Sequence, residues 1–248
     1  MSSPASPSPS PAAAAPRFRQ IIDHLRRSIV AGRLPAHAAL PSERVVAEQH
    51  GVSRMTARRA LEAMEAEGLA YSEGRKGRFV SPKRLSYPIS SMDNYVADAN
   101  AAGIDLEIEI IAHRLTRADA QLAGLLNVPI GEALDETTRL FSNQGHATFL
   151  ETEFIPERRR AELLCTGDVD SAAPLEQRYS PLGHDADIVV RMRALNEDEA
   201  SLLGLAPYQA GIELEQLVHD EAGAPYCFSR QIWRGELAEF SAKAIVNR

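Results

Sequence analysis

The chain has 248 residues, of which 44% are hydrophobic and 25% are charged, which is the composition of a soluble globular protein with material for more than one core. Its formal net charge of −7 is unevenly spread, because residues 1–85 carry 14 Lys/Arg against 7 Asp/Glu, whereas the other 163 residues carry 13 against 27. No apolar run reaches the roughly 18 residues of a transmembrane helix, and two cysteines, Cys165 and Cys227, exclude a disulfide framework or a cysteine-based metal cluster.

The chain begins with a segment rich in serine, proline and alanine, MSSPASPSPSPAAAAP. It lacks the basic start and leucine-rich stretch of a secretory signal, so we expect a disordered tail over residues 1–16. Apolar residues then recur at helical spacing from Ile21 to Ile29. They predict a helix over Arg17–Ala31 that ends before Gly32.

Two further helices follow a loop with two prolines, GRLPAHAALP. Ser42 is a suitable cap for a helix in SERVVAEQH, Gly51 ends that helix, and Ser53 is a cap for the next one. Two helices joined by a short turn that contains glycine are typical of a helix-turn-helix, whose second helix lies in the DNA major groove.

The third helix separates apolar from basic residues. Arg54 and Arg58 lie one turn apart on its surface, with Arg59 nearby, and the first turn also contains Thr56. The amides of that first turn favour a phosphate. The opposite face carries an apolar stripe at i, i+3, i+4 and i+7 spacing, formed by Ala57, Ala60, Leu61 and Met64.

A basic hairpin comes next. Leu69–Tyr71 and Arg78–Val80 have the pattern of two short strands joined by EGRKG, in which Gly74 and Gly77 form the turn. A hairpin with this charge after a recognition helix is typical of a DNA-binding wing. The alternative is a cluster of solvated arginines, but the net charge of +7 over residues 1–85 favours a polyanionic partner. The basic residues of the hairpin are Arg75, Lys76 and Arg78.

Residues 17–81 resemble the N-terminal winged helix of the GntR family of bacterial transcription regulators. The shared pattern is LPSER…GVSRMTARRAL…EGL…G-x-x-G-x-FV. The wing departs from it, because the family often has Q-G-x-G-T where this chain has G-R-K-G-R. The resemblance implies DNA contacts from Arg44, Ser53, Arg54, Thr56, Arg58 and Gly77, and we add Lys76 of the wing as a phosphate contact.

The acidic remainder follows a Pro/Ser-rich segment at 82–91, which we expect to be a linker. Over 92–248, GIDLEIEII and GIELEQLVHD alternate as half-buried strands do, and Arg117–Leu126 is a short predicted helix. A helix, a strand, a glycine turn and a strand recur at a spacing of about 77 residues. We therefore predict an α+β protein, with an antiparallel sheet and its helices on one face.

Residues 90–243 resemble the ligand-sensing (UTRA) domain of HutC-type GntR regulators, whose fold is similar to chorismate lyase. The matching residues include Gly145, Gly223, Pro225, Arg234 and Gly235. The resemblance implies that an effector pocket is lined by Ser91, Arg139, Glu151, Ser171 and Ser229, with Cys227 where the family has a glutamate.

Three departures bear on the effector. Phe141 replaces the second arginine of the family's R-x-R strand, Ala173 replaces a tyrosine, and Cys227 replaces the glutamate. Loss of an arginine removes a charge-assisted contact to phosphate, so we expect an effector with less anionic charge than a sugar phosphate, or one bound differently. The alternative is that Arg139 and Glu151 form a surface cross-strand pair and that Cys227 is a small core residue.

These features predict a cytoplasmic, sequence-specific DNA-binding transcription regulator without a cofactor or metal. We expect a homodimer, most often a repressor in this family, whose pseudo-palindromic DNA operator is released or held according to a small-molecule effector. One alternative is a chorismate-lyase-like enzyme, but the seven histidines are scattered and no nucleophile–base pair is evident, so we expect no enzyme. Another is that the acidic half serves only for dimerisation.

Overall fold

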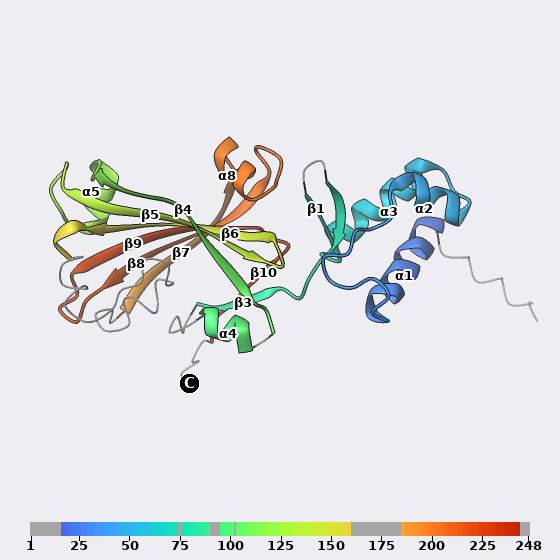
Figure 1. The fold of residues 1–248 in the computed structure, drawn as a ribbon, viewed down its shortest axis with the longest axis horizontal. Coiled ribbons are helices and arrows are strands. Elements are labelled where there is room, and N and C mark those ends of the chain that lie inside the picture. The colour runs from blue at the N-terminus through green and yellow to red at the C-terminus, as the bar shows by residue number, and fades with distance from the viewer. Residues whose placement is uncertain (1–15, 74–75, 90–94, 102, 160–184, 244–248) are drawn as a thin grey trace, which may run out of the picture. The chain divides into compact units, whose positions relative to one another are not determined.

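The computed structural model describes residues 16–73, 76–89, 95–101, 103–159 and 185–243. The chain divides into two compact units, one with residues up to 72 and 77–80, the other with 73–76 and the residues from 81 onward (Figure 1). The tail expected over residues 1–16 lies almost entirely outside the described residues. Each unit is described below by itself.

The first unit contains three helices and a hairpin (Figure 1). The helices are α1 (Arg17–Val30), α2 (Glu43–His50) and α3 (Arg54–Ala66), and the hairpin strands are β1 (Ala70–Glu73) and β2 (Gly77–Val80). The three helices and the hairpin enclose one hydrophobic core, which includes Ile21, Ile22, Leu25, Val46, Ala57, Ala60, Leu61, Met64 and Val80.

Local capping sets the helix-turn-helix boundaries. The Ser42 hydroxyl accepts a hydrogen bond from the Val45 backbone N–H, and the Ser53 hydroxyl accepts one from Thr56 N–H at 3.1 Å. Gly51 has φ 59°, a left-handed conformation that glycine adopts without strain. The two serines and the glycine therefore act as the sequence predicts.

The wing hairpin is joined to the loop between α1 and α2. Ala39 forms an antiparallel bridge with Phe79. Leu40 N–H donates to the Arg78 carbonyl at 2.8 Å, and Val80 N–H donates to the Ala38 carbonyl at 2.9 Å. These backbone hydrogen bonds hold the hairpin against the helical part of the unit.

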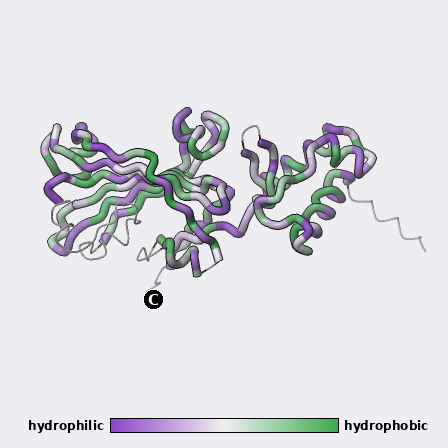
Figure 2. The backbone as a smooth tube through the Cα atoms, in the orientation of Figure 1, coloured by the Kyte–Doolittle hydropathy of each residue, from purple (hydrophilic) through white to green (hydrophobic). Residues whose placement is uncertain are grey.

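A six-stranded antiparallel sheet dominates the second unit (Figure 1). The strands, in spatial order, are β4 (Leu106–Arg117), β5 (Ala133–Asn143), β6 (His146–Pro156), β9 (Pro225–Trp233), β8 (Ala210–His219) and β7 (Asp185–Ala194). In Figure 2, hydrophobic and hydrophilic residues alternate along these strands, as expected for a sheet with two differently covered faces.

Different elements cover the two faces. The helices α5 (Ala120–Leu126) and α8 (Glu197–Leu202) pack on one face. The other face is covered by α4 (Tyr95–Ala101) and by a parallel pair of short strands, β3 (Leu85–Pro88) and β10 (Ala238–Ser241) (Figure 1). Part of the segment expected as a linker is therefore a strand of this unit, with Leu85 and Tyr87 in its core. The prediction that the helices lie on one face is wrong for α4, which packs on the face opposite to α5 and α8.

The sheet is built from two similar halves, β4–α5–β5–β6 and β7–α8–β8–β9. The helix caps Asp119 and Asn196 are 77 residues apart, which confirms the repeat predicted from the sequence. The halves meet where β6 pairs with β9. Helix α5 starts at Ala120 rather than at Arg117, because Arg117 is still part of β4.

Candidate functional site

The exposed side of α3 has two flanks. At 3.6 residues per turn, the buried stripe of α3 leaves Met55 near the centre of the outward face, where it is 71% exposed. Arg54 and Arg58 lie to one side of Met55, whereas Thr56 and Arg59 lie to the other. The structure thus brings the predicted contacts of the first turns of α3 to one surface.

Several predicted cations are paired with nearby carboxylates. Arg58 Nε donates to Glu62 at 2.7 Å, and this hydrogen bond, with the attraction of the same carboxylate, raises the pKa of Arg58 above its usual value. Arg44 lies 2.8 Å from Glu48, one turn along α2. Such exposed pairs are weak, so a phosphate can replace the carboxylate as partner.

Three other arginines of this unit are not paired in this way. Within the part of the chain that the structure describes, Arg17, Arg54 and Arg59 form no ion pair with a carboxylate. The Arg59 guanidinium lies 4.5 Å from the centre of the Phe18 ring, and Arg17 Nη1 donates to the Gly51 carbonyl at 3.3 Å. Their positive charge is therefore available to a polyanion.

The wing contributes backbone geometry and one exposed cation. Gly77 has φ 113°, which disfavours any side chain there, and Lys76 lies 3.3 Å from Glu73. Arg78 is mostly covered, because its guanidinium pairs with Glu43 and Glu65 at 3.3 and 3.2 Å. Arg78 thus ties the wing to α2 and α3. The turn residues at 74 and 75 lie outside the described residues.

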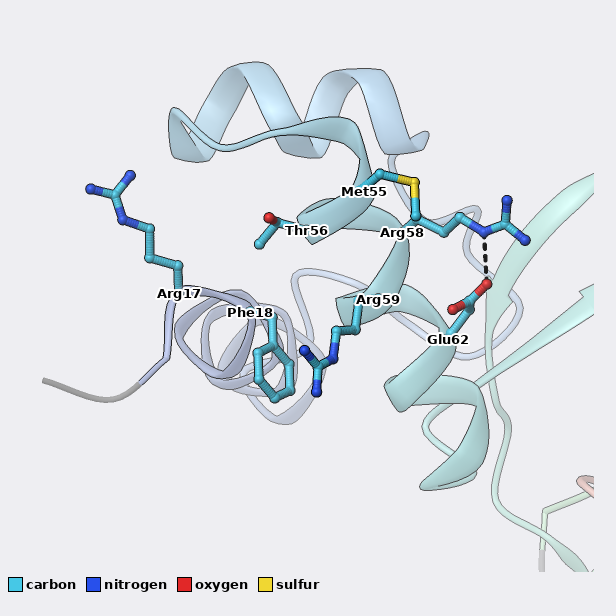
Figure 3. Close-up of a pocket in the computed structure, with 7 residues that line it drawn as sticks. All are labelled: Arg17, Phe18, Met55, Thr56, Arg58, Arg59 and Glu62. Atoms are coloured by element: carbon cyan, nitrogen blue, oxygen red, sulfur yellow. Dashed lines mark hydrogen bonds and ion pairs between the residues drawn. The ribbon is translucent and has the colours of Figure 1, made fainter.

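A concave site of about 540 Å³ lies between the start of α1 and the first half of α3, and we call it the α1–α3 hollow (Figure 3). It is lined by Arg17, Phe18, Met55, Thr56, Arg58, Arg59 and Glu62. The contribution of α1 was not predicted, because Arg17 and Phe18 precede the helix-turn-helix motif. Their signal in the sequence is a basic–aromatic pair at the start of an amphipathic helix.

In the second unit, Arg139 and Glu151 are cross-strand partners on β5 and β6. Arg139 Nη1 lies 3.3 Å from Glu151 Oε2, and both side chains are fully buried. A second carboxylate, Glu153, lies 3.6 Å from the same nitrogen and is also buried. The alternative of an exposed surface pair is wrong, and Glu153 is a neighbour that sequence analysis missed.

The pair belongs to a polar band on one face of the sheet. Gln231, opposite Glu151 on β9, donates through Nε2 to Glu151 Oε1 at 3.1 Å. Ser229 lies opposite Glu153 on β6 and opposite Gln216 on β8. We define the polar band as Arg139, Glu151, Glu153, Gln216, Ser229 and Gln231, all of which are buried.

Two atoms of the polar band lack a hydrogen bond among the described residues, the Ser229 hydroxyl and Gln216 Oε1. Leaving a buried polar atom unsatisfied costs about 1–3 kcal/mol. Gln216 and Ser229 are cross-strand partners on β8 and β9, so the two unsatisfied atoms lie on adjoining strands.

Hydrophobic residues flank the polar band on both sides. Phe141 stacks on Phe149, with ring centres 4.1 Å apart, and Phe149 stacks on Trp233 at 3.9 Å. Phe141, which stands where the family has an arginine, is thus a core residue. At the other end, Cys227 packs in a hydrophobic cluster with Val218 and its neighbours. Ser91 and Ser171 lie outside the described residues, as does Ala173.

The described residues contain no group of three or more His, Cys, Asp or Glu side chains placed to hold a metal ion. None of their helices is long and apolar enough to cross a membrane.

Both units match known families. Residues 18–80 match the bacterial regulatory proteins of the gntR family, and residues 101–239, more than half of the chain, match the UTRA domain. The transcriptional repressor NagR of Bacillus subtilis (strain 168) is 26% identical over 227 residues, which cover 91% of this chain and 93% of NagR. The transcriptional repressor PhnF of Mycolicibacterium smegmatis is 29% identical over 203 residues, which cover 82% of each chain.

The fold also matches a solved structure. The crystal structure of PhnF from Mycobacterium smegmatis has a TM-score of 0.64 with 24% sequence identity, and the match covers 92% of this chain and all of PhnF. The predicted α+β fold, a winged helix joined to an antiparallel sheet with helices, is confirmed. The chain belongs to the gntR family of bacterial regulatory proteins and carries a UTRA domain as its second part.

Proposed function

We propose that this protein is a HutC-type transcriptional repressor in the cytoplasm, which binds operator DNA through its winged helix and releases it in response to a small-molecule effector. The observation that carries this proposal is the presence of two unlike sites on one chain. The exposed face of α3 carries Arg54 and Arg59, which form no ion pair with a carboxylate among the described residues, whereas the polar band of the sheet is buried. NagR and PhnF, both named as transcriptional repressors, support the same function.

In the DNA complex, Arg54 and Arg58 read base edges from the first turns of α3. Ser53 and Thr56 bind phosphate at the helix start, where the backbone N–H groups also point toward an anion. Arg44, Lys76 and Gly77 hold the flanking backbone, which positions the protein but carries no sequence information. We propose 17–81 as the DNA-binding domain and 92–248 as the effector-binding and dimerisation domain. Within the predicted linker 82–91, Leu85–Pro88 forms β3 and belongs to the second of these domains.

A homodimer is the form that suits this function. One winged helix makes few base contacts, and two related by a two-fold axis read two half-sites of a pseudo-palindrome. An effector releases DNA only if it binds more tightly to the state in which the two winged helices are wrongly spaced. A coupling of about 1–3 kcal/mol changes operator affinity about 5- to 150-fold.

The polar band is the proposed effector site, with Arg139, Glu151 and Ser229 as contacts, together with Ser91 and Ser171 as the family resemblance implies. Cys227 forms its apolar end. The single guanidinium of the band faces two carboxylates, Glu151 and Glu153, so its attraction for an anion is offset. We therefore propose a neutral or cationic polar effector rather than a sugar phosphate.

Paired ligands test this choice. The full-length protein is titrated with glucosamine and with glucosamine-6-phosphate by calorimetry, and thermal shift is recorded in parallel. We expect the phosphorylated sugar to bind more weakly than its unphosphorylated partner. Micromolar binding of the phosphate alone contradicts the proposed effector chemistry.

Operator binding is tested with duplexes that tile the promoter region of the gene, by fluorescence anisotropy at low salt. One duplex is expected to bind at least about a thousandfold more tightly than random DNA of the same length. If every duplex binds like random DNA, the repressor function fails.

An enzyme remains the competing function. The relatives named above are regulators, which supports a protein without catalytic activity. Conversion of chorismate by the purified full-length protein is the measurement that revives the enzymatic alternative.

A further inference from the structure

We infer that the α1–α3 hollow binds a phosphate group of the DNA backbone. Of the two DNA strands that border the major groove, it contacts the one farther from the wing. This rests on the proposed function, since it adds a second strand contact to the same DNA interface. It also assigns a role to α1, which the helix-turn-helix pattern leaves without one.

The position of the hollow follows from α3 itself. Glu65 marks the wing flank of α3, because Arg78 of β2 pairs with it at 3.2 Å. Arg59 marks the other flank, where its guanidinium lies over Phe18 of α1. The two residues are about 120° apart around the helix axis at 3.6 residues per turn. A helix in the major groove has one phosphate strand on each side, and the hollow faces the strand away from the wing.

The charges in the hollow suit a phosphodiester. Arg17 and Arg59 have no carboxylate partner among the described residues. Glu62 is the acidic residue of the lining, and it is already bonded to Arg58 (Figure 3). Arg17 and Arg59 stand on opposite sides of the hollow with their guanidinium groups pointing apart (Figure 3), so each offers one guanidinium group to the DNA backbone. Guanidinium groups bind phosphate oxygens through paired N–H donors.

The apolar part of the hollow holds these cations in place. The Arg59 guanidinium lies 4.5 Å from the centre of the Phe18 ring, and Figure 3 shows the two side chains next to each other. Such a contact orients the cation before DNA arrives, so less side-chain freedom is lost on binding. None of these contacts reaches a base edge, so the hollow positions DNA without reading its sequence.

The test uses the full-length protein, its operator and a random duplex over a range of salt concentrations. Arg59→Ala is expected to reduce the slope of log affinity against log salt by about 0.9 and to weaken operator binding about fivefold near 0.15 M salt. The random duplex should lose affinity by the same factor. Arg17→Ala is a second variant with the same expectation, and Arg19→Ala, an exposed arginine of α1 outside the hollow, is the matched control.

Neutral methylphosphonate linkages then locate the contact. Placed one at a time along each strand, one linkage on the strand away from the wing should weaken the wild-type protein but not Arg59→Ala, because the two changes remove the same interaction. The inference is overturned if Arg59→Ala and Arg17→Ala keep the wild-type slope, or if Arg59→Ala loses affinity for the operator alone. If the wild-type protein binds no duplex, both the inference and the proposed function are wrong. If only the variants behave otherwise than expected, the inference is wrong but the proposed function stands.

Discussion

Arg139 and Glu151 face one another across β5 and β6, 3.3 Å apart, with neither side chain exposed. A buried ion pair adds little net stability, because desolvation of both charges offsets their attraction. Here a second carboxylate, Glu153, shares the same guanidinium. The polar band is therefore sensitive to the loss of its one cation, and its charge balance is the basis of the effector chemistry proposed above.

Replacement of the cation should destabilise the second unit. Arg139→Met removes the guanidinium that pairs with two buried carboxylates, Glu151 and Glu153, at a cost of about 3–5 kcal/mol. Trp233 is the single tryptophan of the chain and is buried in the same sheet, so its fluorescence during urea unfolding reports on this unit. If the free energy of unfolding falls by less than about 1 kcal/mol, a strong interaction between Arg139 and the two buried carboxylates is contradicted.

Removal of one negative charge should change ligand preference. Glu153→Gln keeps the Arg139–Glu151 pair and leaves the polar band less negative. We expect the ratio of affinities for glucosamine-6-phosphate and glucosamine to rise about tenfold, equivalent to about 1.4 kcal/mol. Calorimetric titration of both sugars measures the ratio. An unchanged ratio means that Glu153 does not influence the effector.

Arg54 should contribute to sequence discrimination. Arg54→Ala removes an unpaired guanidinium from the first turn of α3, and we expect a loss of about 1–3 kcal/mol on the operator and much less on random DNA. Fluorescence anisotropy with both duplexes at one salt concentration gives the comparison. Equal losses on the two duplexes assign Arg54 to phosphate contact rather than to base reading.

Lys76 should act through the DNA backbone alone. Lys76→Ala is expected to lower the salt slope of operator binding by up to about 0.9, while the ratio of operator to random affinity stays constant. Glu73, 3.3 Å away, competes with phosphate for the ammonium group and makes this an upper value. If the salt slope of Lys76→Ala equals that of the wild-type protein, Lys76 does not contact a DNA phosphate.

Local chemistry made the first unit predictable from sequence. Ser42, Gly51 and Ser53 act on backbone groups within three or four residues, so their pattern identifies the helix ends directly. The repeat in the second half was visible for a similar reason, because each half has its own helix cap and glycine turn. These local signals determined the α+β prediction.

Contacts between distant segments were not predictable. Gln231 donates a hydrogen bond to Glu151, which is 80 residues away in the sequence. Strand β3 pairs with β10, although one lies near the beginning and the other near the end of the unit's sequence. Neither pairing leaves a periodic trace in the sequence. The same applies to Phe18 and Arg59, which meet only because α1 packs on α3. The predicted site residues therefore omitted those that only the tertiary fold brings close.

The junction of β6 and β9 relates the two halves of the sheet by an approximate dyad. Glu151 faces Gln231 and Ser229 faces Glu153, so the register repeats when the halves are exchanged. The equivalent positions have diverged, since Arg139 opposite Glu151 in one half corresponds to Gln216 opposite Ser229 in the other. The Arg139–Glu151 side of the polar band is thus ionic, whereas the Gln216–Ser229 side is neutral, although the strand pairing is similar on the two sides. A molecule bound at this dyad meets unlike partners on its two sides, which restricts it to a single orientation.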